Sequence, residues 1–427
     1  MPVFALVDCN NFYVSCERVF QPNLENKPVA VLSNNDGCLV ARSNEVKKLG
    51  IPMGAPFFKY KEELKLMSCK VFSSNYTLYG DMSARVMEIL SQHCQEMEIY
   101  SIDEAFLDLT GIPEQELIPF CQKLKNLIKK CTGIPVSFGL AGTKTLAKLA
   151  NNLAKDDMRK GQKLYNDVFS FVGMDEAALH KTFSQVAVGD LWGIGRQYTK
   201  KLEASGINTV TQLVKQNPEW INKNLTIQGS RLVQELKGSI CHKLELFSPD
   251  KKSIASTRSF GKSVSDLLNL KEAVGSHANR IGQKLRSGKQ VTSFMQVFVM
   301  TDRFKENFSY KSANFKFANP TNYTPELIER AIHEVEKLFE KGVSYKKAGI
   351  IVSDLQSEIN LQQPLFNEKK FTTEKEKKLM EVFDALNKKF GKMTIRSGQI
   401  GYSKDWQMKQ DLSSPRYTTN WKELLVI

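Results

Sequence analysis

The chain has 427 residues, 41% of them hydrophobic, and a formal net charge of +14 at pH 7. This hydrophobic content excludes a disordered or fibrous chain, and the length predicts about three domains. The longest run without a charged residue, 131–143, contains glycine and proline, so no membrane span is predicted.

The first predicted strand ends in a carboxylate. An apolar run at 3–7 leads directly into Asp8, which is typical of a buried strand. Two more carboxylates, Asp103 and Glu104, lie between two short β-prone runs in 98–109. Carboxylates at neighbouring strand ends repel one another unless a divalent cation neutralises them, and Mg²⁺ favours such ligands together with substrate phosphates. The residues alone leave open that Asp103 and Glu104 cap an ordinary hairpin turn, because acidic turns are common.

Further strands and helices are predicted around this acidic centre. Strands are expected at 29–32 and 136–140, and a helix is expected from Leu117. Another helix begins near Thr143, a residue type that caps helices well. Residues 23–76 form an insert rich in turn signals.

A glycine turn precedes a predicted helix at 196–204, within a region of short helices at 169–240. Gly193 and Gly195 begin a dinucleotide-binding fingerprint, but Tyr198 stands where its third glycine belongs, so a dinucleotide site is not supported. A Gly-x-Gly turn that opens a helix presents free backbone N–H groups to a phosphate. The turn is similar to a helix-hairpin-helix element, which holds a DNA backbone without reading its sequence.

The C-terminal part begins with a tether at 241–252. Strand and helix patterns then follow in the order β-α-β-β-α-β over 254–353, which predicts a ferredoxin-like module. An amphipathic helix is expected at 374–390, before a polar end.

The positive charge is unevenly distributed. Residues 1–240 carry a net charge of +3, and residues 241–427 carry +11. Residues 81–120 sum to −8, whereas residues 251–320 sum to +9. This division suggests a cation-binding centre and a separate polyanion-binding surface, although an ordinary solvated surface would also fit the charges.

Five blocks of sequence are long enough to compare with known families. They are VDCNNFYVSCE (7–17), ARSNEVKKLGIPMG (41–54), YSIDEAFLDLTG (100–111), SFGLAGTKTLAKLANNLAK (137–155) and SPRYTTNW (414–421). Together they resemble the Y-family translesion DNA polymerases, and most of all the UmuC branch, over nearly the whole chain.

The resemblance implies an α+β fold of the right-hand polymerase type. Its expected parts are a ferredoxin-like palm, small fingers, a helical thumb with a helix-hairpin-helix element, and a ferredoxin-like little finger. The predicted boundaries are palm 1–22 and 77–168, fingers 23–76, thumb 169–240, linker 241–251, little finger 252–355 and a regulatory, partner-binding tail 356–427.

The resemblance also implies a metal site. Asp8, Asp103 and Glu104 would be the catalytic carboxylates, and with the backbone carbonyl of Cys9 they would hold two Mg²⁺ ions. Two such ions stabilise the attacking and leaving oxygens of a nucleotidyl transfer.

A dNTP site is implied at Phe12, Tyr13, Asn44, Lys47 and Lys155. Tyr13 matches the family's steric gate, which excludes a 2′-hydroxyl, and Lys155 matches a lysine that contacts the triphosphate. Considered alone, the two aromatic residues could be core packing and Lys155 could be a solvated lysine. The chain departs from the family at Asn44 and Lys47, where many members have tyrosine and arginine, and no proline turn follows Lys155. Lys47 supplies charge but not the bidentate fork of arginine.

DNA contacts are implied in the thumb and the little finger. The expected residues are Gly193, Gly195, Arg196, Lys200, Arg258, Lys262, Arg286 and Lys289. Phosphate contacts of this kind give an affinity for DNA that falls steeply with salt.

Protein partners are implied as well. Gln362, Leu365 and Phe366 resemble the short peptide with which bacterial polymerases bind the sliding clamp. The tail resembles the UmuC-type extension, which implies a dimeric UmuD-type partner and a recombinase filament.

The implied function is template-directed, error-prone translesion synthesis in the bacterial SOS response to DNA damage. Two alternatives stay open: a nucleotidyl cyclase with a palm-like sheet, and a catalytically silent DNA-binding subunit. The eight cysteines form no CxxC pair and the N-terminus has no signal-peptide pattern, so reduced thiols in the cytoplasm, near the nucleoid during action, are expected.

Overall fold

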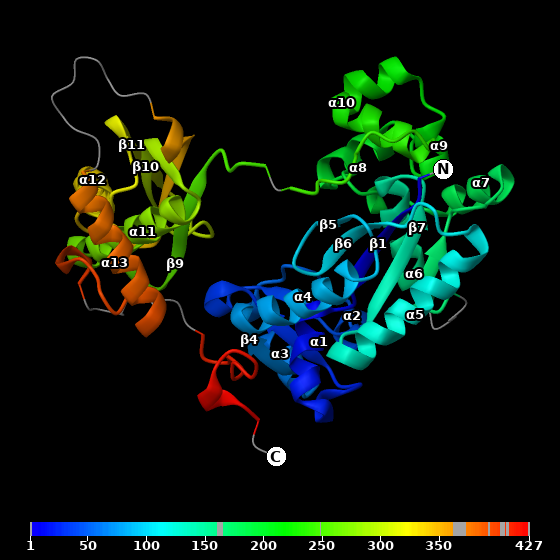
Figure 1. Cartoon of the computed structure of the whole chain (residues 1–427), viewed down its shortest axis with the longest axis horizontal. Coiled ribbons are helices and arrows are strands. Elements are labelled where there is room, and N and C mark those ends of the chain that lie inside the picture. The colour runs from blue at the N-terminus through cyan, green and yellow to red at the C-terminus, as the bar shows by residue number, and fades with distance from the viewer. Residues whose placement is uncertain are drawn as a thin grey trace. The chain divides into compact units, whose positions relative to one another are not determined.

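The computed structural model divides the chain into two compact units. It describes residues 2–159, 165–247, 249–361, 373–391, 393–401, 406 and 410–425. The first unit is Met1–Ser248 together with Asp411–Ile427, and the second unit is Pro249–Gln410 (Figure 1). Among the described residues, every helix is too short or too polar to cross a bilayer.

A five-stranded mixed sheet forms the centre of the first unit, with the strand order β5-β6-β1-β7-β8. The central strand β1 pairs antiparallel with β6 on one side and with β7 on the other. The outer strand β5 pairs antiparallel with β6, and β8 pairs parallel with β7. The strands are β1 (Phe4–Cys9), β5 (Met97–Ile99), β6 (Glu104–Asp108), β7 (Val136–Ala141) and β8 (Val168–Ser170).

Side chains from both faces of this sheet are buried. On one face, alternate residues such as Val7, Leu107 and Phe138 join a core with α1, α4 and α5. On the other face, Leu6 and Phe106 join a second core with α6 and the short helices that follow it. The covering helices are α1 (Phe12–Phe20), α4 (Tyr76–Ser91), α5 (Glu114–Thr132) and α6 (Lys144–Arg159).

Two of these helices test the predicted starting points. The helix expected from Leu117 begins three residues earlier, at Glu114, where acidic side chains suit the positive end of the helix dipole. The predicted cap at Thr143 is confirmed, since its hydroxyl accepts a hydrogen bond of 3.3 Å from the amide of Leu146.

The insert at 23–76, which follows α1, has a small sheet and a core of its own. Strand β2 (Val29–Leu32) pairs antiparallel with β3 (Leu39–Arg42) and parallel with β4 (Lys70–Ser73). Helices α2 (Asn44–Lys48) and α3 (Phe57–Leu66) complete the insert. Its buried core includes Leu32, Val46 and Leu64.

Helices follow the five-stranded sheet, as predicted; three of these four are short, whereas α10 has 19 residues. They are α7 (Glu176–Gln185), α8 (Arg196–Ala204), α9 (Val210–Val214) and α10 (Pro218–Leu236). Helix α8 has the bounds that the sequence predicts, and Gly195 is its N-cap residue.

The second unit contains the predicted β-α-β-β-α-β series. Its elements are β9 (Ile254–Val264), α11 (Leu267–Ser287), β10 (Gln290–Met300), β11 (Tyr310–Thr321), α12 (Thr324–Leu338) and β12 (Tyr345–Ser357). The sheet is antiparallel throughout with the order β11-β10-β12-β9, so the last strand lies between the first two. The α+β fold class is confirmed in both units.

Helices α11 and α12 pack together on one face of this sheet. They form a core with strand residues such as Met295 and Ile350. Most strand residues that point the other way are exposed or half-buried, although Phe298 is buried between its neighbours there. This side, called the open face below, carries Gln296, Asn314, Lys316 and Lys347.

The residues grouped above as one C-terminal tail divide between the two units. Helix α13 (Glu374–Phe390) belongs to the second unit, where Asp384 binds Arg286 of α11. Residues 411–425, called the return segment below, belong instead to the first unit. The chain therefore leaves the first unit, builds the second unit and then comes back.

Candidate active site

Two neighbouring strands of the five-stranded sheet bring three acidic residues to the same end of the sheet, which is called the acidic edge below. Asp8 on β1 is in register with Glu104, the first residue of β6. The amide of Cys9 donates a hydrogen bond of 2.8 Å to the carbonyl of Asp103. The three carboxylate-bearing positions that the sequence predicts therefore lie beside one another.

Lysines from α6 compensate two of these carboxylates. The Nζ of Lys155 lies 2.6 Å from an oxygen of Asp8, and the Nζ of Lys148 lies 3.2 Å from an oxygen of Glu104. All four side chains are less than one-fifth exposed, so water screens these pairs only partly. Lys155 is the lysine that the sequence assigns to the site, while Lys148 was missed.

The electrostatics of the edge are those of crowded carboxylates. Burial raises the pKa of Asp8 to about 6, and the Lys155 ammonium opposes that rise. The neighbouring charges of Glu104 and Asp103 raise the pKa of Asp8 further. Asp103 is itself held by the hydroxyl of Ser101, which donates a hydrogen bond of 2.6 Å to its Oδ1.

The donor chemistry of this edge fits a hard divalent cation, because carboxylate oxygens are the ligands such cations prefer. Within the described ranges, no group of three or more His, Cys, Asp or Glu side chains converges as a ligand set, and lysines balance Asp8 and Glu104 instead. The Cys9 thiol is buried in the core, and burial holds its pKa well above the ordinary value. Cys9 could therefore serve a metal only through its backbone carbonyl.

The acidic edge opens into a cleft of about 440 Å³ that the insert shares. Asp8, Asp103 and Lys155 line it from the sheet and α6, and Tyr76 lines it from α4. The remaining walls consist of Cys9, Asn11, Phe12, Tyr13, Val40, Ala41, Arg42, Lys47, Met53 and Ile102. A cleft with acidic residues at one end and cations beside them can accept a metal-bound polyphosphate.

Two aromatic residues of α1 differ in their surroundings. Phe12 is only 3% exposed and belongs to the core, although part of it reaches the cleft wall. Tyr13 is half-buried, and its ring stacks on Tyr79 of α4 with centroids 4.5 Å apart and planes 15° apart. Tyr76 meets the Tyr13 ring edge-on at 6.0 Å. Tyr13 therefore presents a supported, flat ring to the cleft.

Polar residues of the insert meet the turn after β1. Asn11 accepts a hydrogen bond from the Lys47 ammonium and donates one of 3.0 Å to Asn44. Lys47 lines the cleft, whereas Asn44 is exposed and touches it only through Asn11. Arg42 lines the cleft as well and was missed, although it ends the β3 strand only two residues before Asn44.

The predicted thumb residues are exposed at one turn. Gly193 has a φ of 92°, which favours glycine, and it precedes the N-cap residue Gly195. Arg196 and Lys200 are exposed on the first turns of α8. This turn is therefore accessible to a phosphate backbone, as the sequence predicts for a DNA contact.

The predicted DNA-binding residues of the second unit differ in accessibility. Lys262 and Lys289 are exposed. Arg258 is half-buried and shares its side of β9 with the buried Phe260, which points it toward the helices. Lys316 and Lys347 on the open face were missed, because alternation along a strand does not tell which face helices will cover.

Arg286 has an internal role that the sequence did not suggest. Its guanidinium makes two hydrogen bonds with Asp384 of α13, of 2.7 and 2.9 Å. It also donates to the carbonyl of Asn322 and the hydroxyl of Thr324. These four bonds occupy the side chain inside the second unit, so we remove Arg286 from the expected DNA contacts.

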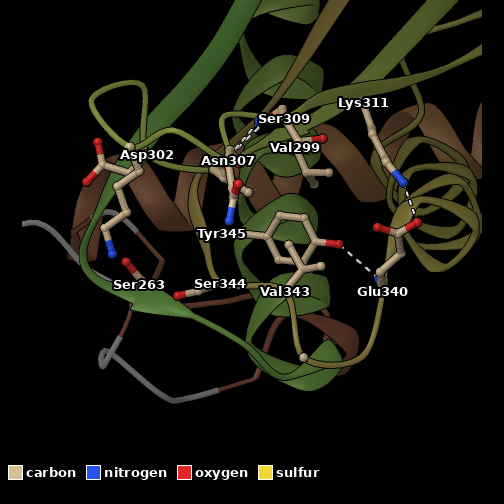
Figure 2. Close-up of a pocket in the computed structure, with 13 residues that line it drawn as sticks. Ser263, Val299, Asp302, Asn307, Ser309, Lys311, Glu340, Val343, Ser344 and Tyr345 are labelled. Atoms are coloured by element: carbon tan, nitrogen blue, oxygen red, sulfur yellow. Dashed lines mark hydrogen bonds and ion pairs between the residues drawn. The ribbon is translucent and has the colours of Figure 1, made fainter.

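A second hollow, of about 310 Å³, lies at one end of the second unit's sheet (Figure 2). The Tyr345 hydroxyl accepts a hydrogen bond of 2.9 Å from the amide of Glu340, whose carboxylate pairs with Lys311. The Glu340 carboxylate is therefore neutralised by the Lys311 ammonium. The hollow therefore lacks the adjacent acidic residues that mark the cleft of the first unit.

The clamp-binding peptide cannot be placed. Gln362, Leu365 and Phe366 lie outside the described residues. Their assignment stays a prediction from the sequence.

Comparison with known sequences gives matches along most of the chain. Residues 7–152 match the model of the impB/mucB/samB family, and residues 251–365 match the C-terminal domain of the same family. Residues 377–427 match a domain of unknown function. The chain is 42% identical to protein UmuC and 38% identical to protein SamB, both of Salmonella typhimurium, over 99% of each chain. It is 27% identical to DNA polymerase IV of Brucella melitensis, over 92% of this chain and 84% of that protein.

Comparison with solved structures supports the fold. A chimeric Y-family DNA polymerase built from Dbh and Dpo4 superposes with a TM-score of 0.63 and 19% identity, over 82% of this chain and 98% of that chain. A ternary complex of Dbh gives a TM-score of 0.54 with the same coverage and identity.

Proposed function

The chain belongs to the impB/mucB/samB family, the UmuC branch of the Y-family DNA polymerases, and we propose from this that it extends a primer along damaged DNA. It is a template-directed, error-prone DNA polymerase that adds dNTPs to a primer 3′-hydroxyl. The observation that carries this function is the register of Asp8 with Glu104 beside Asp103, at the mouth of a cleft shared with the insert. The cyclase and the silent DNA-binding subunit are not favoured.

The acidic edge is the proposed catalytic centre. Nucleotidyl transfer by this family needs a divalent metal, which lowers the pKa of the attacking hydroxyl and stabilises charge on the phosphate. We propose that the metal is Mg²⁺, that two ions bind, and that Asp8, Asp103, Glu104 and the Cys9 carbonyl would hold them. Ser101 orients Asp103 for this role.

Cations around the cleft would hold the triphosphate. Lys155 of α6 and Lys47 of α2 both line the cleft, and Arg42 adds the planar guanidinium that Lys47 cannot supply. Asn11 braces Lys47, and Asn44 braces Asn11. Phosphate binding would therefore depend on the sheet and the insert together.

Tyr13 is the proposed steric gate. With the Tyr13 ring fixed on Tyr79, a 2′-hydroxyl on a sugar bound against the ring would clash with it, whereas a deoxyribose would fit. Phe12 would support the gate from the core rather than contact the nucleotide directly.

DNA would be held by both units. The turn at Gly193 and Gly195 with Arg196 and Lys200 would bind the backbone in the first unit. In the second unit we propose Lys262, Lys289, Lys316 and Lys347 as contacts. Arg258, half-buried on the helix side of β9, is a weaker candidate.

The proposed protein partners follow from the family. They are a sliding clamp bound through Gln362, Leu365 and Phe366, a dimeric UmuD-type protein, and a recombinase filament. A site of action in the cytoplasm at the nucleoid belongs to the same proposal.

Primer extension tests the function. The full chain, with Mg²⁺, dNTPs, a primed template, a clamp and a UmuD-type partner, should add nucleotides opposite undamaged and abasic positions. Asp103→Ala should reduce the rate by about a thousandfold or more. Asp108→Ala is the matched control, because Asp108 lies at the opposite end of β6 and only caps a turn at Thr110. No template-dependent extension by the wild-type chain, or full activity in Asp103→Ala, would reject the proposal.

A further inference from the structure

The return segment is bound to the strand and helix that support the cleft. The amide of Ser73, at the end of β4, donates to the carbonyl of Leu412 at 3.0 Å, and the Leu412 amide donates back to the Ser73 hydroxyl at 3.1 Å. The amide of Asp411 also donates to Asp36 in the insert, at 3.3 Å. These bonds fix the return segment beside residues 73–75, which lead into α4.

Asn75 ties the return segment to the start of α4. Its amide nitrogen donates to the carbonyls of Ser414 and Pro415, each at 3.1 Å, and contacts the Ser414 hydroxyl at 3.0 Å. Its side-chain oxygen accepts from the amide of Leu78 and so caps α4. One side chain therefore couples the helix cap to the return segment.

Glu17 of α1 is a buried acid that depends on the same segment. Its side chain is fully buried, and one carboxylate oxygen accepts hydrogen bonds from the Tyr79 hydroxyl at 2.6 Å and from the Ser414 hydroxyl at 2.9 Å. Its other oxygen has no hydrogen-bond partner among the described residues. Burial raises the pKa of Glu17 to about 7, and both hydroxyls oppose the rise. Since a buried carboxylate needs its donors, loss of either hydroxyl is costly.

Tyr79 links the buried Glu17 to the cleft residue Tyr13. While its hydroxyl binds Glu17, its ring stacks on Tyr13 almost in parallel. Tyr76 on the same helix meets both rings edge-on, at 6.0 and 6.3 Å. A rotation of the Tyr79 ring would therefore move the surface on which Tyr13 rests.

We propose that Ser414 is a positioning residue of the nucleotide site, which fixes Tyr13 through Glu17 and Tyr79 and thereby sets how strongly ribonucleotides are excluded. This inference rests on the proposed function, because it takes Tyr13 as the gate. The return segment lies within residues 377–427, which match a domain of unknown function, and the proposal gives this segment a share in substrate selection.

The return segment has a second anchor that avoids this path. Tyr417 stacks on Phe20 with centroids 4.6 Å apart and planes 13° apart, and its hydroxyl accepts a hydrogen bond from Gln21. Neither contact involves Glu17 or Tyr79. Tyr417 therefore offers a control that weakens docking of the segment without removing the Ser414 hydroxyl.

The experiment measures kcat/KM for a dNTP and for the matching rNTP on one primed template. Ser414→Ala in the full chain should lower the discrimination between the two sugars by about tenfold, and Ser414→Thr should restore it. Tyr79→Phe keeps the ring but removes the hydroxyl, so it should repeat the effect even if Ser414→Ala folds poorly. Tyr417→Leu should lower the melting temperature but leave discrimination unchanged.

Tyr13→Ala distinguishes a failure of the gate role of Tyr13 from a failure of the positioning role of Ser414. If Tyr13→Ala admits ribonucleotides while Ser414→Ala and Tyr79→Phe discriminate like the wild type, the positioning role is wrong and the gate stands. Equal losses of sugar discrimination in Ser414→Ala and Tyr417→Leu would also reject the positioning role. They would show that Ser414 only helps the return segment to dock. Unchanged discrimination in Tyr13→Ala would reject both the gate and the inference, while loss of all extension in the wild type would reject the polymerase function itself.

Discussion

The two large sheets of this chain differ in how much of their surface is covered. The five-stranded sheet of the first unit is buried on both faces, so only the ends of its strands reach solvent-accessible space. The four-stranded sheet of the second unit packs helices on one face and leaves the open face accessible. A doubly covered sheet can offer a compact site at a strand end, whereas an open face can follow an extended polymer. The sheet covered on both faces is thus suited to a catalytic site, and the sheet covered on one face is suited to holding DNA.

The largest effect on stability is expected from replacing one glycine by alanine in each sheet. A Cβ at Gly139 in β7 would lie 2.1 Å from the Asn151 amide nitrogen and 2.3 Å from the Ala147 carbonyl oxygen, both backbone atoms of α6. A Cβ at Gly349 in β12 would lie 2.5 and 2.7 Å from two side-chain atoms of Thr257 and 2.9 Å from the Phe298 ring, so it would meet side chains of the open face rather than backbone. Gly139→Ala should therefore lower the unfolding free energy of the first unit by about 3 kcal/mol or more, and Gly349→Ala that of the second by about 1 kcal/mol.

Calorimetry of the full chain can follow both units in one scan. Each substitution should move the transition of its own unit and leave the other in place. Equal losses for the two glycine substitutions would show that coverage of the sheet does not govern tolerance.

A smaller contrast is expected in how the two units respond to pH. Burial raises the pKa of Glu17 to about 7, so the folded chain keeps a proton that the unfolded chain releases above about 4.5. Its stabilising contribution is complete below pH 4.5 and is lost as the pH rises to 7. Burial, assisted by Arg280, lowers the pKa of His277 in the second unit to about 3. The contribution of His277 is present above pH 6.5 and is lost as the pH falls toward 3.

Urea unfolding at several pH values between 4.5 and 6.5 measures this contrast. Glu17→Gln and His277→Gln should each remove a slope of at most about 1.4 kcal/mol per pH unit, of opposite sign, from the unit that carries it. A variant whose pH profile runs parallel to the wild type would show that its group does not titrate as described.

The smallest effect concerns charge on the open face. Lys316 is exposed there, and Lys347 lies over the ring of Phe298 at 5.8 Å. The Lys316→Ala/Lys347→Ala double variant should weaken duplex binding by about tenfold and reduce the slope of log K against log salt by about 2.

The control removes the same charge from the other side of the sheet. Lys271 on α11 and Lys337 on α12 already pair with glutamates, and their double alanine variant should leave the salt slope almost unchanged. Equal slopes for the two double variants would mean that net charge, rather than the open face, attracts DNA.

Local sequence patterns were sufficient to predict much of the fold and the acidic residues of the candidate site. The apolar run before Asp8, the helix after Gly195 and the order of elements in the second unit all follow from residues close together in sequence. The three acidic residues of the site were found because each lies at the edge of a short hydrophobic run, which marks a strand end in any sheet.

Long-range pairs could not be predicted in the same way. Ser414 and Glu17 are 397 positions apart, and nothing near either residue indicates the other. Arg286 appeared as one more surface cation because its partner Asp384 lies in a helix 98 positions away. Arg42 was missed since its role depends on how the insert closes on the sheet. Such contacts arise only when separate elements pack together, and they leave no periodic trace in the sequence.

The return segment also sets an order of events during synthesis of the chain. A ribosome makes residues 411–425 only after the whole second unit, and at roughly 5–20 residues per second this takes on the order of ten to thirty seconds. During that interval Glu17 lacks its second donor, and Asn75 lacks its carbonyl partners on the return segment. A nascent chain that lacks the return segment can thus hold its acidic residues in place while the hydrogen bonds that support the cleft are still incomplete. If Ser414 positions Tyr13 as proposed, full sugar selectivity is acquired only after the return segment has been made.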